Sequence, residues 1–317
     1  MVLLMYCLHL DGRDWFASFI GALSILFRQT NIVWVFFMAA QAAGPFLVNF
    51  SREARLENKA VRFSLNTWGQ IKELFEGLYL MLFSPSKCFN LVRKINYTCF
   101  GYIIVAMAFV SFVILNNGVV VGDRSAHQVV MHPTQILYFS AFSVMLSAPY
   151  ALTRLLPFYE LCKKHWAILA FAIVCVIGVI KSYTIAHPYL LADNRHFTFY
   201  IWRRIVTRTD EMPMYLAPIY IFGAFSVFYS LRRADLVFKM AFLVCIVINL
   251  APLYLLEFRY FVIPFILQRL QIRPLNWWTL CLEMALFQGL NLATLALFLF
   301  QPFVWEHEPD QVQRFMW

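Results

Sequence analysis

Charged side chains are scarce in this sequence. They make up 14% of its 317 residues, against roughly 25% in soluble domains, whereas hydrophobic residues make up 62% and the mean hydropathy is +0.67. This composition excludes a water-soluble fold. The net charge of +9 does not indicate a nucleic-acid partner, because basic residues normally flank membrane helices. The sequence predicts an all-α, polytopic membrane protein in contact with membrane lipids.

The motifs of soluble enzymes are also missing. There is no phosphate-binding loop, no GxGxxG, no HExxH and no GxSxG. The seven cysteines include no CxxC pair, and the seven histidines lack the spacing of metal ligands. We therefore expect neither a metal ion nor a cofactor. Glu283 lies within an apolar run, where it is either a functional acid or a paired or interfacial residue.

The first ten residues lack the basic region and the cleavage site of a signal peptide. Met1 to Leu10 is apolar but covers only about half of a membrane span. We expect this segment to be the second half of a helix, so that the chain begins inside a larger architecture.

Nine apolar runs predict membrane helices within one transmembrane domain over residues 1–317. The runs cover residues 15–27, 32–48, 97–115, 133–152, 167–185, 213–230, 236–256, 259–269 and 277–300. Arg28 separates the first two runs. One continuous helix would bury this arginine at a cost of roughly 2.5–3.5 kcal/mol or more, so we expect two helices, with Phe27 to Asn31 at a membrane face.

Basic residues are concentrated in the segment 50–96, which holds eight of the 26 lysines and arginines. Its apolar residues recur at helical spacing from Leu65 to Leu82. The pattern predicts an amphipathic helix lying on the cytoplasmic surface of the membrane. Alternation of the spans then places Arg154 in a cytoplasmic loop and residues 186–211 in a motif loop on the far face.

Four short polar segments, residues 27–31, 122–127, 192–196 and 257–261, fall on this far face, where almost all the basic residues are arginines. Arginine is the preferred bidentate partner of phosphate. Together the segments predict a polar cavity, closed by aromatic rings, for a phosphate-bearing lipid with a sugar or other polar head. The residues expected to bind this ligand are Arg28, Gln29, Asn31, Asp123, Arg124, Asn194, Arg195, His196, Tyr200, Arg203, Arg204, Glu257, Arg259 and Tyr260.

The same segments carry a resemblance to a known family. FRQTNIVWV, NNGVVVGDRSAH, YLLADNRHFTFYIWRR, LLEFRYFVIPFIL and QRFMW resemble the dolichyl-phosphate-glucose-dependent alpha-1,2-glucosyltransferases, in the same order and over nearly all of the chain. The resemblance implies a GT-C-type, multi-pass glycosyltransferase of the endoplasmic reticulum membrane, with its motif loops in the lumen. It implies dolichyl-phosphate-glucose as the donor and Glc2Man9GlcNAc2 on dolichyl pyrophosphate as the acceptor, for protein N-glycosylation.

The resemblance also suggests roles for the polar residues. Arginines such as Arg195, Arg203, Arg204 and Arg259 would hold the donor phosphate and stabilise the charge of the leaving dolichyl phosphate. The residues that would orient sugar hydroxyls are Arg28, Gln29, Asn31, Asp123, Asn194 and His196. A base would deprotonate the acceptor hydroxyl for in-line displacement.

The family carries its candidate base in an acidic motif near the N-terminus, and this sequence does not contain that motif. We therefore expect the chain to lack the family's N-terminal part, and a truncated, inactive form is one outcome. The acids near the polar segments are Asp193, Asp123 and Glu257, each flanked by an arginine, and each is either the base or that arginine's partner. The alternative to a transferase is a non-enzymatic membrane regulator of an ion channel.

Overall fold

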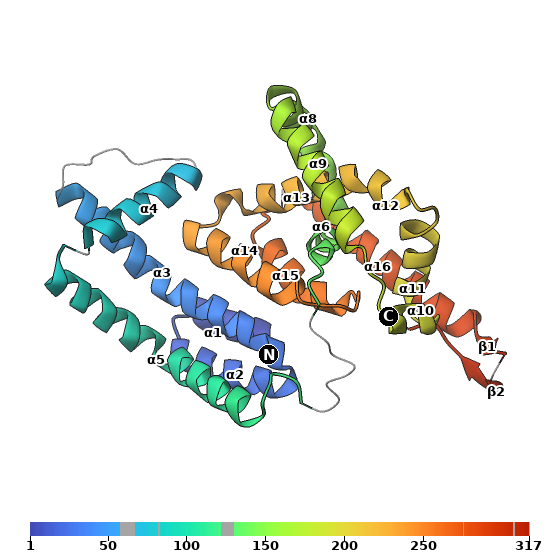
Figure 1. The fold of residues 1–317 in the computed structure, drawn as a ribbon, viewed down its shortest axis with the longest axis horizontal. Coiled ribbons are helices and arrows are strands. Elements are labelled where there is room, and N and C mark those ends of the chain that lie inside the picture. The colour runs from blue at the N-terminus through green and yellow to red at the C-terminus, as the bar shows by residue number, and fades with distance from the viewer. Residues whose placement is uncertain (58–66, 82, 122–129, 275, 307, 317) are drawn as a thin grey trace. The chain divides into compact units, whose positions relative to one another are not determined.

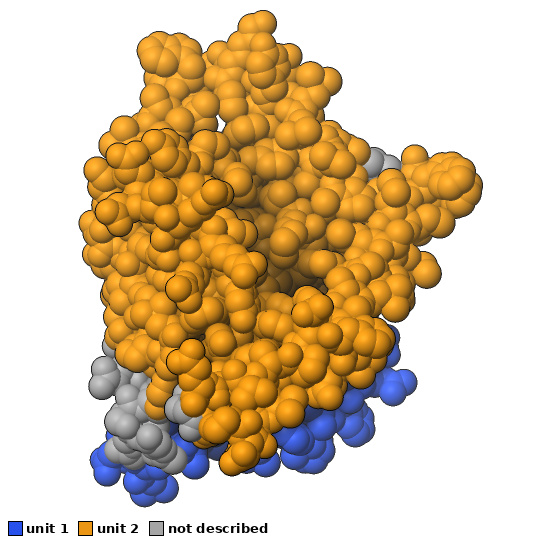
Figure 2. Space-filling model, turned by 90° about the vertical axis from the view of Figure 1, so that its right-hand side faces the viewer, with its two compact units in different colours: residues 1–127, 234–249 blue, residues 128–233, 250–317 orange. Residues whose placement is uncertain are grey.

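The computed structural model describes residues 1–57, 67–81, 83–121, 130–274, 276–306 and 308–316. The contacts within the chain define two compact units, which are coloured separately in Figure 2, and Figure 1 labels the helices and strands. Unit 1 comprises residues 1–127 and 234–249, and unit 2 comprises residues 128–233 and 250–317. The expectation of a single domain over the whole chain stays a prediction.

The secondary-structure elements described in unit 1 are all helical. Its elements are α1 (Val2–Leu10), α2 (Asp14–Phe27), the 3-10 turn η1 (Gln29–Asn31), α3 (Ile32–Glu57), α4 (Thr67–Met81), α5 (Pro85–Leu115) and α14 (Leu236–Leu250), whose last residue groups with unit 2.

The break predicted at Arg28 is confirmed. Helix α2 ends at Phe27, and Arg28 has an extended backbone with φ −157° and ψ 116°. The side-chain amide of Asn31 donates to the carbonyl oxygen of Ser24 at 2.8 Å, so one of the last carbonyl groups of α2 gains a partner. The location of this break at a membrane face stays a prediction.

Helix α4 confirms a helix within the basic segment, where it packs on α3. The hydroxyl of Ser51 donates to the carbonyl oxygen of Glu73 at 3.0 Å, and Arg55 pairs with the carboxylate of Glu73 at 2.9 Å. Leu65 and Leu82, which were expected on its apolar face, lie outside the described residues. The position of α4 on the cytoplasmic membrane surface stays a prediction.

Unit 2 contains the remaining helices and a hairpin, and one of its faces is hollowed (Figure 2). Its elements are α6 (Thr134–Leu146), α7 (Ala148–Ala151), η3 (Leu152–Arg154), α8 (Leu155–Lys164), α9 (Trp166–Tyr183), α10 (Pro188–Ala192), α11 (Phe197–Ile201), the π-helical turn η4 (Trp202–Val206), α12 (Met212–Tyr215), α13 (Ala217–Ser230), η5 (Leu231–Arg233), α15 (Arg259–Leu270), α16 (Trp277–Phe300), β1 (Phe303–Trp305) and β2 (Glu308–Gln313).

The single span expected over residues 133–152 is a bent pair of helices. Helix α6 ends before Ser147, and the chain turns by 89° into the helical stretch Ala148–Lys164. Pro149 explains the break, because a proline donates no backbone hydrogen bond and restricts the residue before it. The cytoplasmic loop expected around Arg154 is therefore helical instead. Arg154 is 4% exposed, and its guanidinium donates to the hydroxyl of Ser226 on α13 at 2.6 Å.

Glu283 of α16 is an ion-pair partner. Its carboxylate accepts two hydrogen bonds from the guanidinium of Arg269 on α15, both at 2.5 Å, and one from the hydroxyl of Tyr150 on α7 at 3.0 Å. A carboxylate inside an apolar bundle needs such partners because it would otherwise be buried as an uncompensated charge. Of the two interpretations of Glu283, the structure therefore supports the paired one.

Five helical stretches in the described residues are long and apolar enough to cross a membrane, or six if the bent pair counts as one. They are Gln29–Glu57, Pro85–Leu115, Trp166–Tyr183, Met212–Arg233 and Trp277–Phe300. On α9, the apolar side chains of Ile168, Phe171 and Val174 are 67%, 71% and 68% exposed, as expected of surfaces that contact lipid. The chain is an all-α polytopic membrane protein. Among the described residues, its strands are those of the hairpin β1–β2.

Two helices of unit 2, α6 and α13, approach each other closely at Gly223 of α13. A Cβ atom on Gly223 would lie 2.7 Å from the backbone carbonyl of Ser140 on α6, and the Ser140 hydroxyl donates to the carbonyl of Tyr220 at 3.1 Å. Gly178 on α9, in contrast, faces open space, because no atom of a neighbouring element lies within 4 Å of a Cβ atom placed there.

These surroundings predict opposite effects of the same change. Gly223→Ala must separate α6 from α13, so we expect its free energy of unfolding to fall by about 1–3 kcal/mol. Gly178→Ala meets no neighbour and should leave stability unchanged or slightly raised, because alanine favours helix more than glycine. Thermal unfolding of the two purified variants in one detergent measures the difference, and equal melting temperatures would contradict the close contact.

Candidate functional site

The motif Asp193 to His196 lies between α10 and α11 and begins with a tight local turn. The backbone N–H of Arg195 donates to Oδ1 of Asp193 at 2.9 Å, which is the hydrogen bond of an Asx turn. The guanidinium of Arg195 then donates from Nε to Oδ1 at 2.9 Å and from Nη2 to Oδ2 at 2.7 Å. Two parallel charge-assisted bonds fix the guanidinium in one plane. The Nε2 atom of the His196 ring lies 3.6 Å from Oδ2 of Asp193.

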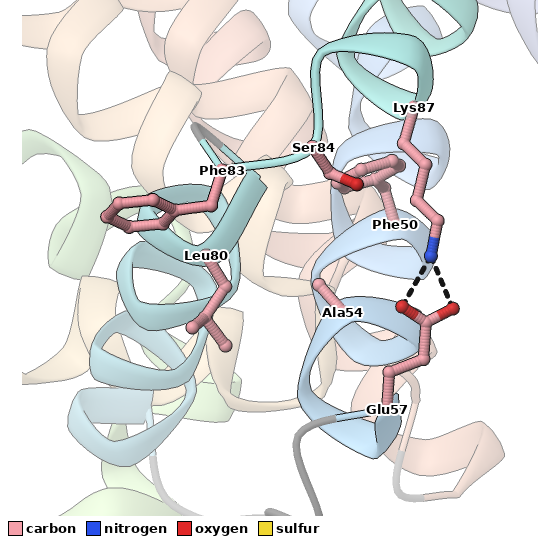
Figure 3. Close-up of a pocket in the computed structure, with 7 residues that line it drawn as sticks. All are labelled: Phe50, Ala54, Glu57, Leu80, Phe83, Ser84 and Lys87. Carbon is pink, nitrogen blue, oxygen red and sulfur yellow. Dashed lines mark hydrogen bonds and ion pairs between the residues drawn. The ribbon is translucent and has the colours of Figure 1, made fainter.

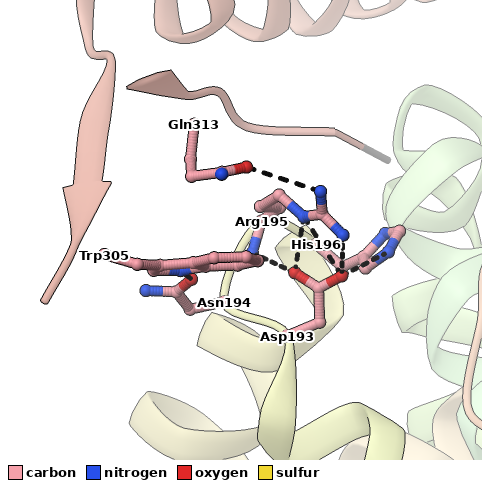
Figure 4. A network of polar contacts seen from close by, with 6 residues as sticks. All are labelled: Asp193, Asn194, Arg195, His196, Trp305 and Gln313. Atoms are coloured by element: carbon pink, nitrogen blue, oxygen red, sulfur yellow. Dashed lines mark hydrogen bonds and ion pairs between the residues drawn. The ribbon is translucent and has the colours of Figure 1, made fainter. Parts of the chain in front are cut away.

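Residues from the C-terminal hairpin complete this network (Figure 4). The guanidinium of Arg195 lies 4.9 Å from the centre of the Trp305 ring and donates to Oε1 of Gln313 at 3.4 Å. The indole N–H of Trp305 donates to the side-chain oxygen of Asn194 at 2.7 Å. Arg195 is thus held by a carboxylate on one side and an aromatic ring on another, so its charge is balanced within the protein.

The backbone of Met316, which follows the hairpin, binds the motif as well. The N–H of Met316 donates to the carbonyl oxygen of Arg195 at 2.7 Å, and the N–H of Phe197 donates to the carbonyl oxygen of Met316 at 3.3 Å. These two bonds form a short parallel bridge. The expected motif loop 186–211 therefore contains short helices and is anchored to the end of the described chain.

The ion pair sets the protonation of Asp193. Hydrogen bonds from Arg195 hold the pKa of the Asp193 carboxyl below its ordinary value, more than burial raises it. A carboxylate with a lowered pKa is a weak proton acceptor. The structure thus places Asp193 as the partner of Arg195, one of the two roles that the sequence left open. Glu257 likewise forms an ion pair with its neighbour Arg259, and Tyr260 is buried beside it.

An open pocket of about 620 Å³ is lined by residues that come directly after the motif in the sequence. We call it the arginine pocket, and its lining residues are Phe199, Tyr200, Arg203, Arg204, Thr207 and Arg208.

The turn η4 positions these side chains. Trp202 and Val206 are buried in unit 2, whereas Arg203 and Arg204 are exposed. A π-helical turn inserts one residue relative to an α-helix, and such turns are frequent at functional sites. The guanidinium of Arg204 lies 5.3 Å from the centre of the Tyr200 ring, and that of Arg203 lies 6.0 Å from the Phe199 ring.

None of the arginines of this pocket forms an ion pair with a residue that the structure describes. Arg203, Arg204 and Arg208 therefore concentrate positive charge beside two aromatic rings. Such a site suits an anion with several oxygen atoms, above all a phosphate group.

Several of these residues were not predicted. Arg208, Phe199 and Thr207 join Arg203 and Arg204 in the pocket; the spacing of Arg204 and Arg208 by four positions was the available signal. Trp305 and Gln313 had no such signal, because they are 111 and 118 positions away from their partners in the motif.

The other expected ligand residues are distributed differently. Arg28, Gln29 and Asn31 belong to unit 1, and Asp123 and Arg124 lie outside the described residues. Within unit 2, the ring of Tyr254 lies 4.4 Å from that of His187, and these two residues precede the other two polar segments in the sequence. The convergence of all four segments on one cavity stays a prediction.

Unit 1 has a smaller pocket of about 290 Å³ between the ends of α3 and α4 and the start of α5 (Figure 3). Phe50, Ala54 and Leu80 contribute apolar surface, and Lys87 forms an ion pair with Glu57 at its edge. The charge of Lys87 is thereby balanced, which makes this pocket less suited to an anion than the arginine pocket. No group of three potential metal ligands occurs in the part of the chain that the structure describes.

Comparison with known sequences gives the family. The sequence model of the DIE2/ALG10 family matches residues 1–270. This chain belongs to the DIE2/ALG10 family. No solved structure matches it. The family match agrees with the resemblance carried by the polar segments, because most of these segments lie within residues 1–270.

Relatives of this DIE2/ALG10 chain occur in animals and plants. It is 34% identical over 99% of its length to a Mus musculus protein, 33% identical over 99% to a Homo sapiens protein and 32% identical over its full length to an Arabidopsis thaliana protein. Each relative is named Dol-P-Glc:Glc(2)Man(9)GlcNAc(2)-PP-Dol alpha-1,2-glucosyltransferase. The chain spans 66% of the mouse and human proteins and 70% of the plant protein.

The Asp193–Arg195 pair predicts a pH-dependent contribution to stability. The folded-state pKa of Asp193 is lowered, so its stabilising effect is complete above the unfolded pKa of about 3.9 and is lost as the pH falls through the folded-state value. We expect Asp193→Asn to have a lower melting temperature than the wild type at neutral pH. The two curves should converge toward about pH 3 or below.

The matched control is Asp210→Asn, because Asp210 is exposed and forms no ion pair with a described residue. This variant should melt like the wild type at every pH. A difference between wild type and Asp193→Asn that stays constant into acid would contradict the pairing.

Proposed function

We propose that this chain is a membrane glycosyltransferase that transfers glucose from dolichyl-phosphate-glucose in alpha-1,2 linkage to Glc2Man9GlcNAc2 on dolichyl pyrophosphate. The observation that carries the proposal is the arginine pocket of unit 2. Its arginines suit a lipid-linked phosphate, and relatives over the whole chain are named for such a donor. The product would be the lipid-linked oligosaccharide used for protein N-glycosylation.

The pocket would stabilise the leaving group of the reaction. In the transfer, an acceptor hydroxyl oxygen bonds to the anomeric carbon of glucose and the bond from that carbon to the phosphate oxygen breaks. The electron pair leaves with dolichyl phosphate, whose negative charge increases as the bond breaks. Arg203, Arg204 and Arg208 would bind this phosphate and lower the energy of the charged transition state.

We assign the donor phosphate to these arginines rather than to Arg195. The guanidinium of Arg195 is already held by both oxygens of Asp193, so it has less charge to offer to a substrate. Asp193 and Glu257 are then structural partners and not the base, and the proton of the acceptor hydroxyl goes to a base not identified in this chain. Asn194 and His196 of unit 2 would still orient sugar hydroxyls.

The setting proposed for this reaction is the endoplasmic reticulum membrane. About nine spans in a GT-C-like bundle would place residues 186–211 on the luminal side, where the donor and acceptor meet. The reaction would need no metal and no cofactor, because the arginines supply the positive charge that a metal ion would otherwise provide. No contact within the described residues favours the alternative of a channel regulator.

The proposal predicts a specific loss in Arg204→Ala. Removing one donor to a developing negative charge typically costs about a hundredfold in rate, so transfer should fall by about that factor. The measurement is transfer of glucose to the diglucosylated oligosaccharide by membranes from cells that lack their own transferase and express this chain. Arg232→Ala is the control, because Arg232 is also exposed but stacks 4.0 Å from the ring of Tyr229, away from the pocket.

Two results would overturn the proposal. If the diglucosylated oligosaccharide still accumulates in cells that express the wild-type chain, the chain is not itself the transferase. If Arg204→Ala and Arg232→Ala are equally active, the arginine pocket is not the phosphate site.

A further inference from the structure

The C-terminal tail of unit 2, described over residues 303–306 and 308–316, is fixed to the rest of the unit at separate points. The hairpin pairs Phe303 with Gln313, and the guanidinium of Arg314 donates to the carbonyl oxygen of Phe298, in the last turn of α16, at 2.7 Å. Carbonyl groups at a helix end lack partners within the helix, so this bond satisfies one of them. Beyond Arg314, the backbone of Met316 bridges to Arg195 and so brings the tail against the start of α11.

This attachment directs the ring of Phe315 into an aromatic cluster. Its centre lies 5.2 Å from that of Phe303, 6.2 Å from that of Phe197 and 5.5 Å from that of Tyr200. Val312 of the same hairpin is 63% exposed and offers a comparison. Aromatic rings packed in this way have few alternative orientations, so Phe315 restricts the ring of Tyr200.

Tyr200 connects the cluster to the arginine pocket. One neighbour of its ring is Phe315, and another is the guanidinium of Arg204, 5.3 Å from the ring centre. Both Tyr200 and Arg204 line the pocket. A long arginine side chain binds an anion well only if its guanidinium is already held near the binding position, because ordering it on binding costs free energy.

We infer that the C-terminal tail is a positioning element of the arginine pocket: Phe315 holds the ring of Tyr200, and that ring holds Arg204 in place for the phosphate of a lipid ligand. Phe315 is a positioning residue and does not touch the ligand itself. The inference rests on the proposed function, since it assumes that the pocket binds a lipid phosphate.

A double-mutant cycle on binding tests this inference. The probe is dolichyl phosphate, titrated into the full chain in nanodiscs of a neutral phospholipid, with dolichol as the uncharged control ligand. We expect Phe315→Ala to weaken binding of dolichyl phosphate by about tenfold, the range of one lost cation–π contact. In the background of Arg204→Ala, the same change should have no further effect, because Phe315 acts through Arg204.

Three comparisons separate positioning from a general loss of structure. Phe315→Tyr keeps the ring and should restore wild-type affinity, and Val312→Ala on the same hairpin should bind like the wild type. If Phe315→Ala does not give folded protein, Phe315→Leu, which keeps most of the volume without the ring, replaces it in the cycle. Equal affinities of the wild type and Phe315→Ala (or Phe315→Leu in its place), or additive effects with Arg204→Ala, would overturn the inference and leave the proposed function standing. No preference of the wild type for dolichyl phosphate over dolichol would overturn both.

Discussion

A charge placed inside an apolar protein has to be compensated, and this constraint organises the polar residues of this chain. Arg154 binds the hydroxyl of Ser226, Arg269 binds Glu283, and Arg195 binds Asp193. For Arg154 and Glu283, which are buried, the alternative would be a buried charge without a partner, at a cost of several kcal/mol. The exceptions are therefore informative: the exposed arginines of the pocket carry charge that no described residue balances, which makes them available to a ligand.

The Asp193–Arg195 pair is better understood as a structural support than as a catalytic group. Its bidentate geometry gives the motif one conformation, and the Trp305 ring and the Met316 backbone then attach the tail to it. The helix α11 and the turn η4 follow directly after this anchored motif in the chain. A site built in this way separates two tasks, because paired charges hold the scaffold while arginines without an acidic partner face the pocket.

Local sequence signals predicted much of the helical framework. The run at 277–300 corresponds to α16, and the break at Arg28 occurs where a buried arginine would have been costly. The bend at Ser147 was missed because the apolar pattern continues across it, and only Pro149 marked it. At the site, the pairing of each acid with a nearby arginine could be predicted from the sequence, since the two residues of each pair are two positions apart.

The sequence by itself determined the class of the protein. Scarcity of charge and long apolar runs require membrane helices whatever the tertiary arrangement, because backbone polar groups in lipid must be satisfied within each helix. Only the tertiary structure decided which polar residues form the site. The contacts of Arg195 with Gln313, Trp305 with Asn194, and Phe315 with Tyr200 join positions more than a hundred residues apart, and no local periodicity records such pairs. They arise because the folding of unit 2 brings the end of α16 and the hairpin beside α11.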